Sequence, residues 1–300
     1  MKPTLRQLQY LVAVADTGRF GAAAKKMNVS QPSLSAQIAE AEAHLGALLL
    51  ERGRRGAFLT PAGREVVRRA RIILAEAADL RSAAAAGGAL AGRIRLGVLP
   101  SVGPYLLPRA IGGVHLAYPD LRLAISEGDT RTLDIGLGEG RLDAVVSTPE
   151  DHVGDSAPLF RERLWIAMAP DDPLARDAGP LKLRGLADRT LLTLSPGYRF
   201  ATLIHTLAAE AGAHVSEEYE GGSLDAIRLM AATGAGLAVL PELYARTEAL
   251  RGDDIALRLI DDQRAMRGVS LIWRPGSPLE GAFRELAESL RAAAADLTDG

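Results

Sequence analysis

The chain has 300 residues, of which 48% are hydrophobic, with a formal net charge of −2 at pH 7; this length predicts about two domains. It contains no cysteine, which excludes disulfides, thiolate metal sites, iron–sulfur clusters and thiol redox chemistry. No apolar run approaches the roughly 18 residues of a membrane span, and Arg6, Gln7 and Gln9 interrupt any signal-peptide core, so we expect a cytoplasmic protein without membrane contact.

Charge is distributed unevenly along the chain. Residues 1–60 carry a net charge of +4, residues 61–90 carry +2, and the remainder carries −8. A basic head on an acidic body favours DNA binding at one end, because phosphate contacts need Lys and Arg. A chance fluctuation would produce the same excess, so the charge distribution alone does not establish DNA binding.

Three helices are expected in the first 45 residues. Apolar residues at helical spacing predict a helix over 4–17, and an Ala-rich stretch predicts another over 20–27. Asn28 and Val29 then form a turn before a third helix, which Ser30 can cap. Two short helices joined by a tight turn are typical of a helix-turn-helix. The expected core positions are Leu5, Leu8, Leu11, Val12 and Ala15 in the first helix, and Leu34, Ile38, Ala41 and Leu45 in the third.

The third helix carries short or planar neutral side chains on its other face. Such groups donate and accept hydrogen bonds and are suited to reading base edges in a major groove. The alternative is an ordinary surface helix of a helical domain. We expect DNA contacts from Gln31, Pro32, Ser33, Ser35 and Gln37.

A short hairpin is predicted after the third helix. Residues 51–60 (ERGRRGAFLT) combine two glycines and three arginines with apolar Phe58 and Leu59. This pattern indicates a β-hairpin wing, whose Arg52, Arg54 and Arg55 would meet phosphate or enter a minor groove. Residues 1–60 are therefore expected to form one DNA-binding domain.

A long helix is predicted over residues 61–86. Its apolar seam alternates steps of four and three residues, which favours a two-helix coiled coil with a second chain. The alternative is a helix packed on its own domain. Gly87, Gly88 and Gly92, with Ala89 and Ala91 between them, indicate a hinge, so residues 61–92 form a linker. The seam consists of Val66, Ala70, Ile73, Ala77, Leu80 and Ala84.

From Arg93 onward the pattern becomes α/β. Strands alternate with helices, which predicts parallel, doubly wound sheets. About 200 residues of this pattern exceed one small sheet, so two lobes with a cleft between them are expected. We place the crossovers near Arg161–Leu164 and Ala265–Gly268, which assigns 93–163 with 268–300 to one lobe and 164–267 to the other. The expected strands are 94–98, 121–125, 144–147, 164–169, 190–194, 236–240 and 269–273, and the later helices are 198–211, 224–233 and 278–297.

Polar side chains follow several of these strands. Ligands of open α/β sheets bind beyond the carboxyl ends of the strands, and free backbone N–H groups at helix N-termini favour anions. Arg199 adds a guanidinium group, whose paired N–H donors suit a carboxylate. Simple N-capping is the alternative for each Ser or Thr. The expected effector-binding residues are Ser101, Thr130, Ser195, Tyr198, Arg199 and Ser223.

Signals for catalysis are weak. The five histidines are scattered without metal-ligand spacing, and neither a Gly-x-Ser-x-Gly elbow nor a Walker loop occurs. The glycine-rich stretch GLGEG at 136–140 lies within or at the end of a helix, so it is a weak phosphate-loop candidate. We therefore expect no catalytic residue, metal or cofactor. A solute-binding protein or an enzyme built on the α/β body stays as the alternative class if the head does not bind DNA.

Several motifs together resemble the LysR-type transcriptional regulators over essentially the whole chain. The resemblance is carried by the first helix and by AAAKKMNVSQPSLSAQI (22–38), EAEAHLG (40–46), LLLER (48–52), LTPAG (59–63) and GVLPSVGPYLLP (97–108). It implies an α/β protein with an all-α winged helix-turn-helix head, a long dimerising linker helix and a two-lobed, periplasmic-binding-protein-like effector domain. It also implies double-stranded DNA and a small-molecule effector as partners, and assembly as a homodimer or homotetramer. Many members carry Arg where this chain has Ala36, so one DNA contact of the family is missing here.

Within this family the body is most similar to the OxyR-like, peroxide-sensing branch. The matching segments are GRLDAVV (140–146), LSPGYR (194–199), EAGA (210–213), GGSLDAIRLMAATGAGLAVLP (221–241) and IWRPGSPL (272–279). The resemblance places the branch's reactive cysteine at Arg199, its second cysteine near Ala208 and a preceding histidine at Tyr198. The hydroxyls that hold peroxide correspond to Ser101 and Thr130. Thiol–disulfide switching is excluded, so Arg199 either receives a small anion or forms internal ion pairs that lock one conformation.

Overall fold

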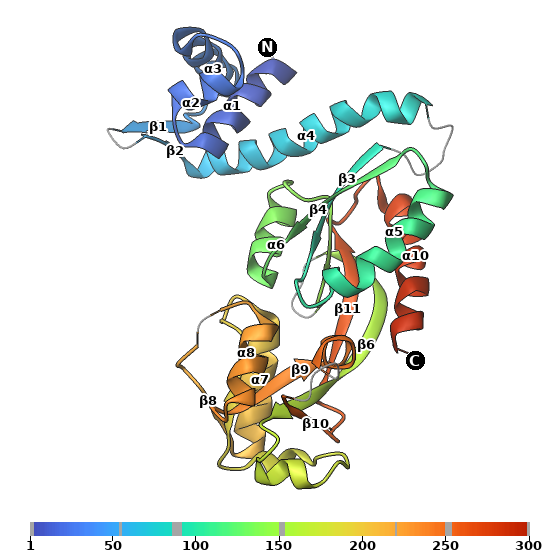
Figure 1. The fold of residues 1–300 in the computed structure, drawn as a ribbon. Helices are drawn as coiled ribbons and strands as arrows, with labels where there is room; N and C mark the ends of the chain where they lie inside the picture. Colours follow the sequence, from blue (N-terminus) through green and yellow to red (C-terminus); the bar gives the residue numbers. More distant parts are fainter. Residues whose placement is uncertain are drawn as a thin grey trace. The chain divides into compact units, whose positions relative to one another are not determined.

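The computed structural model describes residues 3–53, 56–85, 92–149, 154–219, 221–249 and 254–298 (Figure 1). The chain divides into two compact units. The head unit comprises Met1–Arg93 with Gly138–Arg141, and the body unit comprises Ile94–Leu137 with Leu142–Gly300. Among the described residues, no helix is both long and apolar enough to cross a membrane.

The head unit begins with three helices, a two-stranded hairpin and a long fourth helix. Thr4 and Gln7 form a reciprocal capping box at the first helix, which ends at Gly18 with φ 66°. Asn28 supplies the tight turn at φ 54°, a left-handed conformation that Asn tolerates better than most residues. The elements are α1 (Leu5–Thr17), α2 (Phe20–Lys26), α3 (Gln31–Leu45), β1 (Leu50–Gly53), β2 (Gly56–Leu59) and α4 (Pro61–Ala85).

The head core differs in part from the expected one. Leu34 and Ile38 are fully buried as predicted, but Leu5 and Leu45 are exposed at 48% and 40%. Tyr10 and Val14 are buried in the core instead. The prediction for Leu45 was wrong because it is the last residue of α3, where Gly46 already turns the chain away.

The long helix α4 packs on its own domain at its N-terminal end. Val67 and Ala70 are buried, and α1 contacts α4. Val66 is half-buried and Ile73 is exposed, so the expected seam is only partly covered within one chain. The structure does not describe the side chains of two expected seam residues, Leu80 and Ala84. The expected hinge lies outside the described residues at Gly87, Gly88, Ala89 and Ala91.

The strands of the body unit form one continuous hydrogen-bonded order that extends through two lobes. In the described part of the chain this order runs β4-β3-β5-β11-β6-β9-β7-β8, with β10 paired to β6. The strands are β3 (Gly92–Val98), β4 (Leu121–Glu127), β5 (Ala144–Ser147), β6 (Asp155–Met168), β7 (Thr190–Leu192), β8 (His214–Val215), β9 (Leu237–Pro241), β10 (Ala256–Leu259) and β11 (Met266–Trp273).

Helices flank this sheet in both lobes. Trp273 of β11 packs on Phe283 of α10 with ring centroids 5.6 Å apart, and α10 also contacts α5 (Figure 1). The α-helices are α5 (Gly103–Ala117), α6 (Thr130–Gly138), α7 (Arg199–Ala211), α8 (Leu224–Ala232), α9 (Glu242–Thr247) and α10 (Glu280–Thr298), and two 3-10 turns cover Pro173–Arg176 and Leu183–Leu186.

The long strand β6 connects the two lobes. Its Arg163 pairs with Met266 of β11, whereas the next residue, Leu164, pairs with Pro241 of β9. We therefore call β3, β4, β5, β11 and the start of β6 the first lobe, and the end of β6 with β7 to β10 the second lobe (Figure 1).

The sheet is mixed rather than parallel, which corrects the sequence prediction. β3 pairs parallel to β5, and β7 pairs parallel to β8 and β9, as expected of α/β units. However, β11 runs antiparallel to both β5 and β6, and β6 runs antiparallel to β9 and β10. The chain leaves the first lobe along β6 and returns along β11, so these two strands must run in opposite directions.

Candidate functional site

The N-terminal turn of α3 presents the residues expected to read DNA. Ser30 caps the helix, its hydroxyl accepting from the backbone N–H of Ser33 at 3.3 Å. Gln31, Pro32 and Ser33 are exposed, and Ser35 is partly exposed. Leu34 and Ile38 anchor the opposite face in the head core, so the polar face is held outward.

Gln37 has a different environment from the other predicted DNA-reading residues. Its side-chain amide donates to Glu40 Oε2 at 3.2 Å, and the same oxygen accepts from Gln7 at 3.0 Å. Glu40 therefore ties the middle of α3 to α1. A DNA contact by Gln37 could use its carbonyl oxygen or its second amide N–H while the bond to Glu40 stays in place. Gln31 and Ser35 lie nearer the N-terminus of the helix.

The predicted wing is a hairpin of β1 and β2. Arg52 lies in β1 opposite Ala57 of β2, and the N–H of Ala57 donates to the Gly18 carbonyl at 2.8 Å. Gly56 has φ 138°, and a Cβ there would lie 2.6 Å from the Gly18 oxygen, so a side chain would separate the wing from α1. Arg54 and Arg55, expected at the wing tip, lie outside the described residues.

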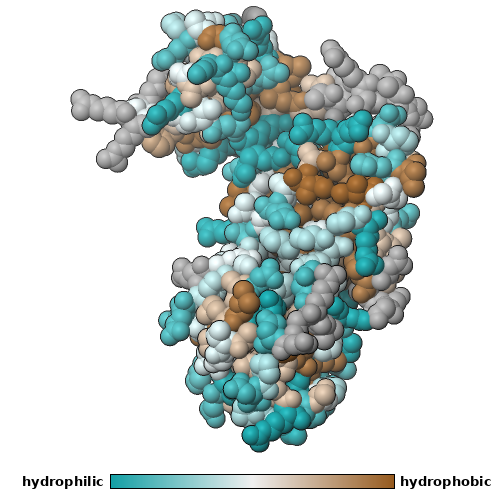
Figure 2. Space-filling view, in the orientation of Figure 1, coloured by the Kyte–Doolittle hydropathy of each residue, from teal (hydrophilic) through white to brown (hydrophobic). Residues whose placement is uncertain are grey.

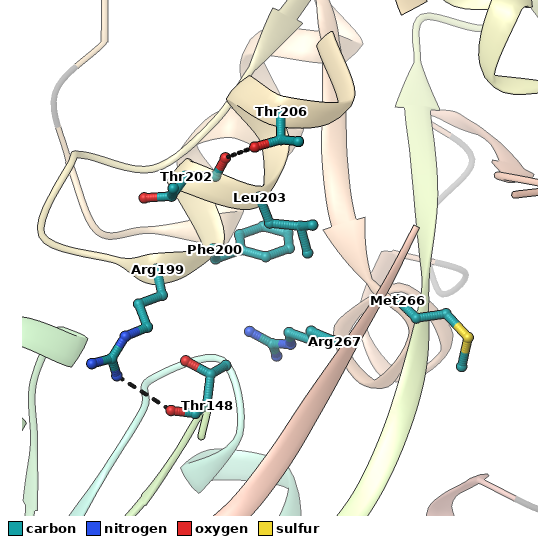
Figure 3. Close-up of a pocket in the computed structure, with 8 residues that line it drawn as sticks. All are labelled: Thr148, Arg199, Phe200, Thr202, Leu203, Thr206, Met266 and Arg267. Carbon is teal, nitrogen blue, oxygen red and sulfur yellow. Dashed lines mark hydrogen bonds between the residues drawn. The ribbon is translucent and has the colours of Figure 1, made fainter. Parts of the chain in front are cut away.

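In the body unit, the six expected effector residues separate into groups. Ser101 and Ser223 line one cavity of about 490 Å³. Thr130 and Arg199 line another of about 290 Å³, and Arg199 also lines a third of about 230 Å³ (Figure 3). Ser195 and Tyr198 line none of these three cavities.

Arg199 joins the two lobes. It is the first residue of α7 in the second lobe, and its Nη2 donates to Asp134 Oδ2 of α6 at 2.8 Å. Its Nη1 donates to the Thr148 carbonyl at 3.3 Å, and its backbone N–H donates to Thr130 Oγ1 at 3.3 Å. Three polar bonds from one residue therefore connect α7 to the end of β5 and the start of α6.

Asp134 was missed by the sequence reasoning. It lies one turn after Thr130 on α6, so both side chains are on the same face of that helix. This spacing was the available signal. The partner of Arg199 could not be chosen from it, because Asp134 and Arg199 are 65 residues apart along the chain.

Around Ser223, the hydroxyl serves as an N-cap. Its Oγ accepts from the backbone N–H of Ala226 at 3.2 Å, as the capping alternative predicts. In the same cavity, the Tyr244 hydroxyl donates to Asp225 Oδ1 at 2.5 Å. Burial raises the pKa of Tyr244 well above its usual range, and the adjacent Asp225 carboxylate adds to the shift, so the phenol stays a donor at neutral pH.

The loop before α7 is shaped by Tyr198. A Cβ at Gly222 would lie 2.3 Å from the Tyr198 hydroxyl oxygen, so the ring packs directly over this glycine. Burial, followed by the nearby Asp129 charge, raises the pKa of Tyr198. The ring of Tyr198 therefore leaves no room for a side chain at residue 222.

A buried ion pair supports the cavity next to Arg199. Arg267 Nε donates to Glu162 Oε1 at 2.7 Å, and the second oxygen of Glu162 accepts from the backbone N–H of Leu243 at 2.7 Å. The Arg267 guanidinium also lies over the Phe200 ring, 5.2 Å from its centroid. Figure 3 shows it extending from β11 toward Thr148 and Arg199.

The described residues contain no group of three or more His, Asp or Glu that could hold a metal ion. The cavity walls offer instead guanidinium groups, hydroxyls, apolar side chains and the Asp134 carboxylate. Such walls bind and orient a small molecule by ion pairing and hydrogen bonding.

Family models cover the chain almost completely. Residues 5–64 match "Bacterial regulatory helix-turn-helix protein, lysR family", and residues 87–295 match "LysR substrate binding domain". The first match contains α1 to β2, and the second contains both lobes with the cavities described above.

Several similar proteins come from one branch of that family. The DNA-binding transcriptional dual regulator OxyR of Escherichia coli K12 is 37% identical over 292 residues, which cover 96% of this chain and 95% of the relative. A full-length OxyR variant from Pseudomonas aeruginosa superposes with a TM-score of 0.76 at 33% identity, covering 96% of this chain and 98% of that one. An H2O2-bound OxyR mutant from Corynebacterium glutamicum gives a TM-score of 0.68 at 30% identity, covering 100% and 95%. The chain therefore belongs to the LysR family of DNA-binding transcriptional regulators and is an OxyR-like member that contains no cysteine.

Proposed function

We propose that this regulator responds to a small anionic effector received at Arg199, between the two lobes, and not to oxidation of a thiol. One similar structure is of an OxyR protein with H2O2 bound. None of the 300 residues here is a cysteine, so the chain itself cannot undergo a thiol–disulfide switch. The proposed activity is regulation by binding, without an enzymatic step or a cofactor.

The observation that carries this proposal is the placement of Arg199. Its guanidinium is about a quarter exposed, and it lines two cavities while holding Asp134 across the lobes. The Asp134 carboxylate accepts from one nitrogen of the Arg199 guanidinium, and an incoming carboxylate can form an ion pair with the same guanidinium and so compete with Asp134. The lobes would then rearrange only if the ligand binds one arrangement better than the other.

A footprint on the DNA upstream of the protein's own gene tests the proposal. We expect protection to change when small carboxylates are added and to stay unchanged with peroxide. A footprint that responds to peroxide alone would contradict an anionic effector. The experiment uses the full chain, because the head reads DNA and the body binds the effector.

The variant Asp134→Asn is expected to shift the footprint toward the effector-bound pattern without added ligand. The substitution keeps the side-chain shape and removes the charge that pairs with Arg199. Asp177→Asn is the matched control, since Asp177 pairs with Arg258 at 2.9 Å, elsewhere in the second lobe. Equal footprints for the wild type and Asp134→Asn would remove the ion pair from the switch.

A ligand-independent regulator is the second candidate. The observation in its favour is that the Arg199 guanidinium is already bonded to Asp134 and to the Thr148 carbonyl, which would lock one arrangement of the lobes. A footprint that no carboxylate changes, combined with a changed footprint for Asp134→Asn, would support this candidate.

We propose that Gln31, Pro32, Ser33, Ser35 and Gln37 contact bases and that Arg52, Arg54 and Arg55 contact phosphate or the minor groove. Gln31→Ala or Ser35→Ala is then expected to weaken operator binding by roughly 1–3 kcal/mol if a bidentate base contact is lost. Binding isotherms on operator and on random duplex separate base contacts from phosphate contacts, whose affinity falls steeply with salt. Gln263→Ala, at an exposed position in the body unit, is the control; unchanged operator affinity for both test variants would remove these residues from the interface.

We also propose that the chain works as a homodimer or homotetramer in the cytoplasm, where its DNA target lies. Leu116 at the end of α5 is 87% exposed, and Ile125 of β4 is exposed as well. Figure 2 shows hydrophobic surface where Figure 1 draws β3, β4 and the end of α5. An exposed apolar patch of this kind favours a subunit contact, and sedimentation equilibrium would contradict it by finding only monomer.

We propose that each segment of the chain has its own role. Residues 1–60 bind DNA, 61–92 link, 93–163 with 268–300 form the first lobe, and 164–267 form the second. Support comes from the unit boundary between Arg93 and Ile94, and from the change of β6 partner between Arg163 and Leu164.

A further inference from the structure

The cavity of about 230 Å³ next to Arg199 contains polar groups that the Arg199–Asp134 pair does not use. It lies between the first turns of α7, the residue after β5 and the start of β11 (Figure 3). Phe200, Leu203 and Met266 give it apolar walls. Its polar groups come from both lobes, so a ligand in it would contact both.

Arg267 brings an uncompensated donor to this cavity. Its side chain is only 3% exposed, and its Nε is engaged by Glu162. Its Nη2, however, is buried without a hydrogen-bond partner among the described residues. Both Glu162 oxygens are already engaged, one by Arg267 Nε and the other by the Leu243 N–H. A buried guanidinium N–H without an acceptor is costly, which leaves a strong preference for an incoming acceptor.

Thr148 supplies a second group of this kind. The residue is buried, and its Oγ1 also has no hydrogen-bond partner within the described part of the chain. Its carbonyl is occupied, since it accepts from Arg199 Nη1 at 3.3 Å. Two residues with such buried donors, Arg267 and Thr148, therefore line one cavity, and Arg199 is a second cationic residue of the same cavity.

We infer that this cavity binds the carboxylate of a short apolar acid. The carboxylate oxygens accept from Arg267 Nη2 and the Thr148 hydroxyl, and the hydrocarbon body lies against Phe200, Leu203 and Met266. The inference rests on the proposed function, because it names the chemical class of its effector. A cavity of roughly 150 Å³ holds benzene, so about 230 Å³ suits an acid of four to six carbon atoms.

Calorimetric titration of the full-length, DNA-free protein tests the inference. Butyrate and hexanoate are expected to bind saturably, whereas the isosteric amides butyramide and hexanamide, which lack the charge, are expected not to bind. Thr148→Val keeps the shape and removes the hydroxyl, and should weaken hexanoate binding about tenfold, as loss of a hydrogen bond to a charged group does.

Thr193→Val is the matched control. The Thr193 hydroxyl is also buried and without a hydrogen-bond partner among the described residues, but it does not line this cavity. Its replacement is expected to leave hexanoate binding unchanged. Equal weakening by both substitutions would overturn the site, since it would show a general effect on the fold.

Arg267→Lys provides a second, independent variant. It keeps a cation beside Glu162 and removes the second guanidinium nitrogen, so the folded protein should bind hexanoate at least tenfold more weakly. Failure of folded wild-type protein to bind either acid would overturn the inference, as would equal binding of acid and amide. Binding that leaves the DNA footprint unchanged would support the carboxylate site and contradict the proposed effector response, so the two can fail separately.

Discussion

Replacing Glu162 by alanine is expected to lower the free energy of unfolding of the body unit by about 3–5 kcal/mol, the usual effect of breaking a buried ion pair. The Glu162 side chain is fully buried, and it accepts from both Arg267 and the Leu243 backbone. Its removal leaves the Arg267 guanidinium buried without its partner carboxylate and the Leu243 N–H without its acceptor. Urea unfolding followed by tryptophan fluorescence measures this loss, because Trp165 and Trp273 both lie in the body unit.

Glu210→Ala is the matched control for Glu162→Ala. Glu210 pairs with Arg264 at 2.6 Å, but the Arg264 side chain is 57% exposed. Exposed ion pairs typically contribute about 0–1 kcal/mol, so this variant should unfold close to the wild type. Similar losses for both variants would show that Glu162 stabilises the fold no more than a surface residue does.

Replacing Leu34 by alanine is expected to abolish operator binding by unfolding the head. Leu34 is fully buried among α1, α2 and α3, and truncating such a leucine costs about 2–5 kcal/mol. A domain of this small size has only marginal stability, so a loss of this magnitude is a large share of it. Footprinting should detect no protection, while the tryptophan transition of the body unit stays in place.

Leu45→Ala is the control for Leu34→Ala, because it truncates a leucine of the same helix without opening the core. Leu45 lies on the same helix but is substantially exposed, so its truncation removes little buried area. Operator binding should be retained. Loss of binding with Leu45→Ala, or full binding with Leu34→Ala, would contradict the assignment of Leu34 as the anchor of α3.

Local sequence signals predicted the head better than the body. The Ser30 cap, the Asn28 turn and the positions of Leu34 and Ile38 depend on neighbours a few residues away, and all are present. The body strands were mostly located, but the short β8 and β10 were missed, and so was the first part of β6. The two residues of β8 are too few for a periodic pattern, and β10 is a strand because it pairs with β6, a contact that its own residues do not specify.

Sheet direction was the main error in the fold. Alternating strands and helices favour parallel pairing, and β3 with β5 follows that rule. The two strands that connect the lobes break it, because β6 and β11 cross in opposite directions. No local property of Val269–Trp273 distinguishes a parallel strand from an antiparallel one.

The sequence by itself determined the DNA-reading head and the absence of a thiol switch, because helix periodicity, caps and composition are properties of neighbouring residues or of the whole count. Only the tertiary structure decided that Arg199 pairs with Asp134, and that Arg267 and Thr148, each with a buried donor, line one cavity. Arg267 and its partner Glu162 are 105 residues apart along the chain. Contacts over such distances depend on how the two lobes fold together along β6 and β11, and no spacing within the sequence specifies them.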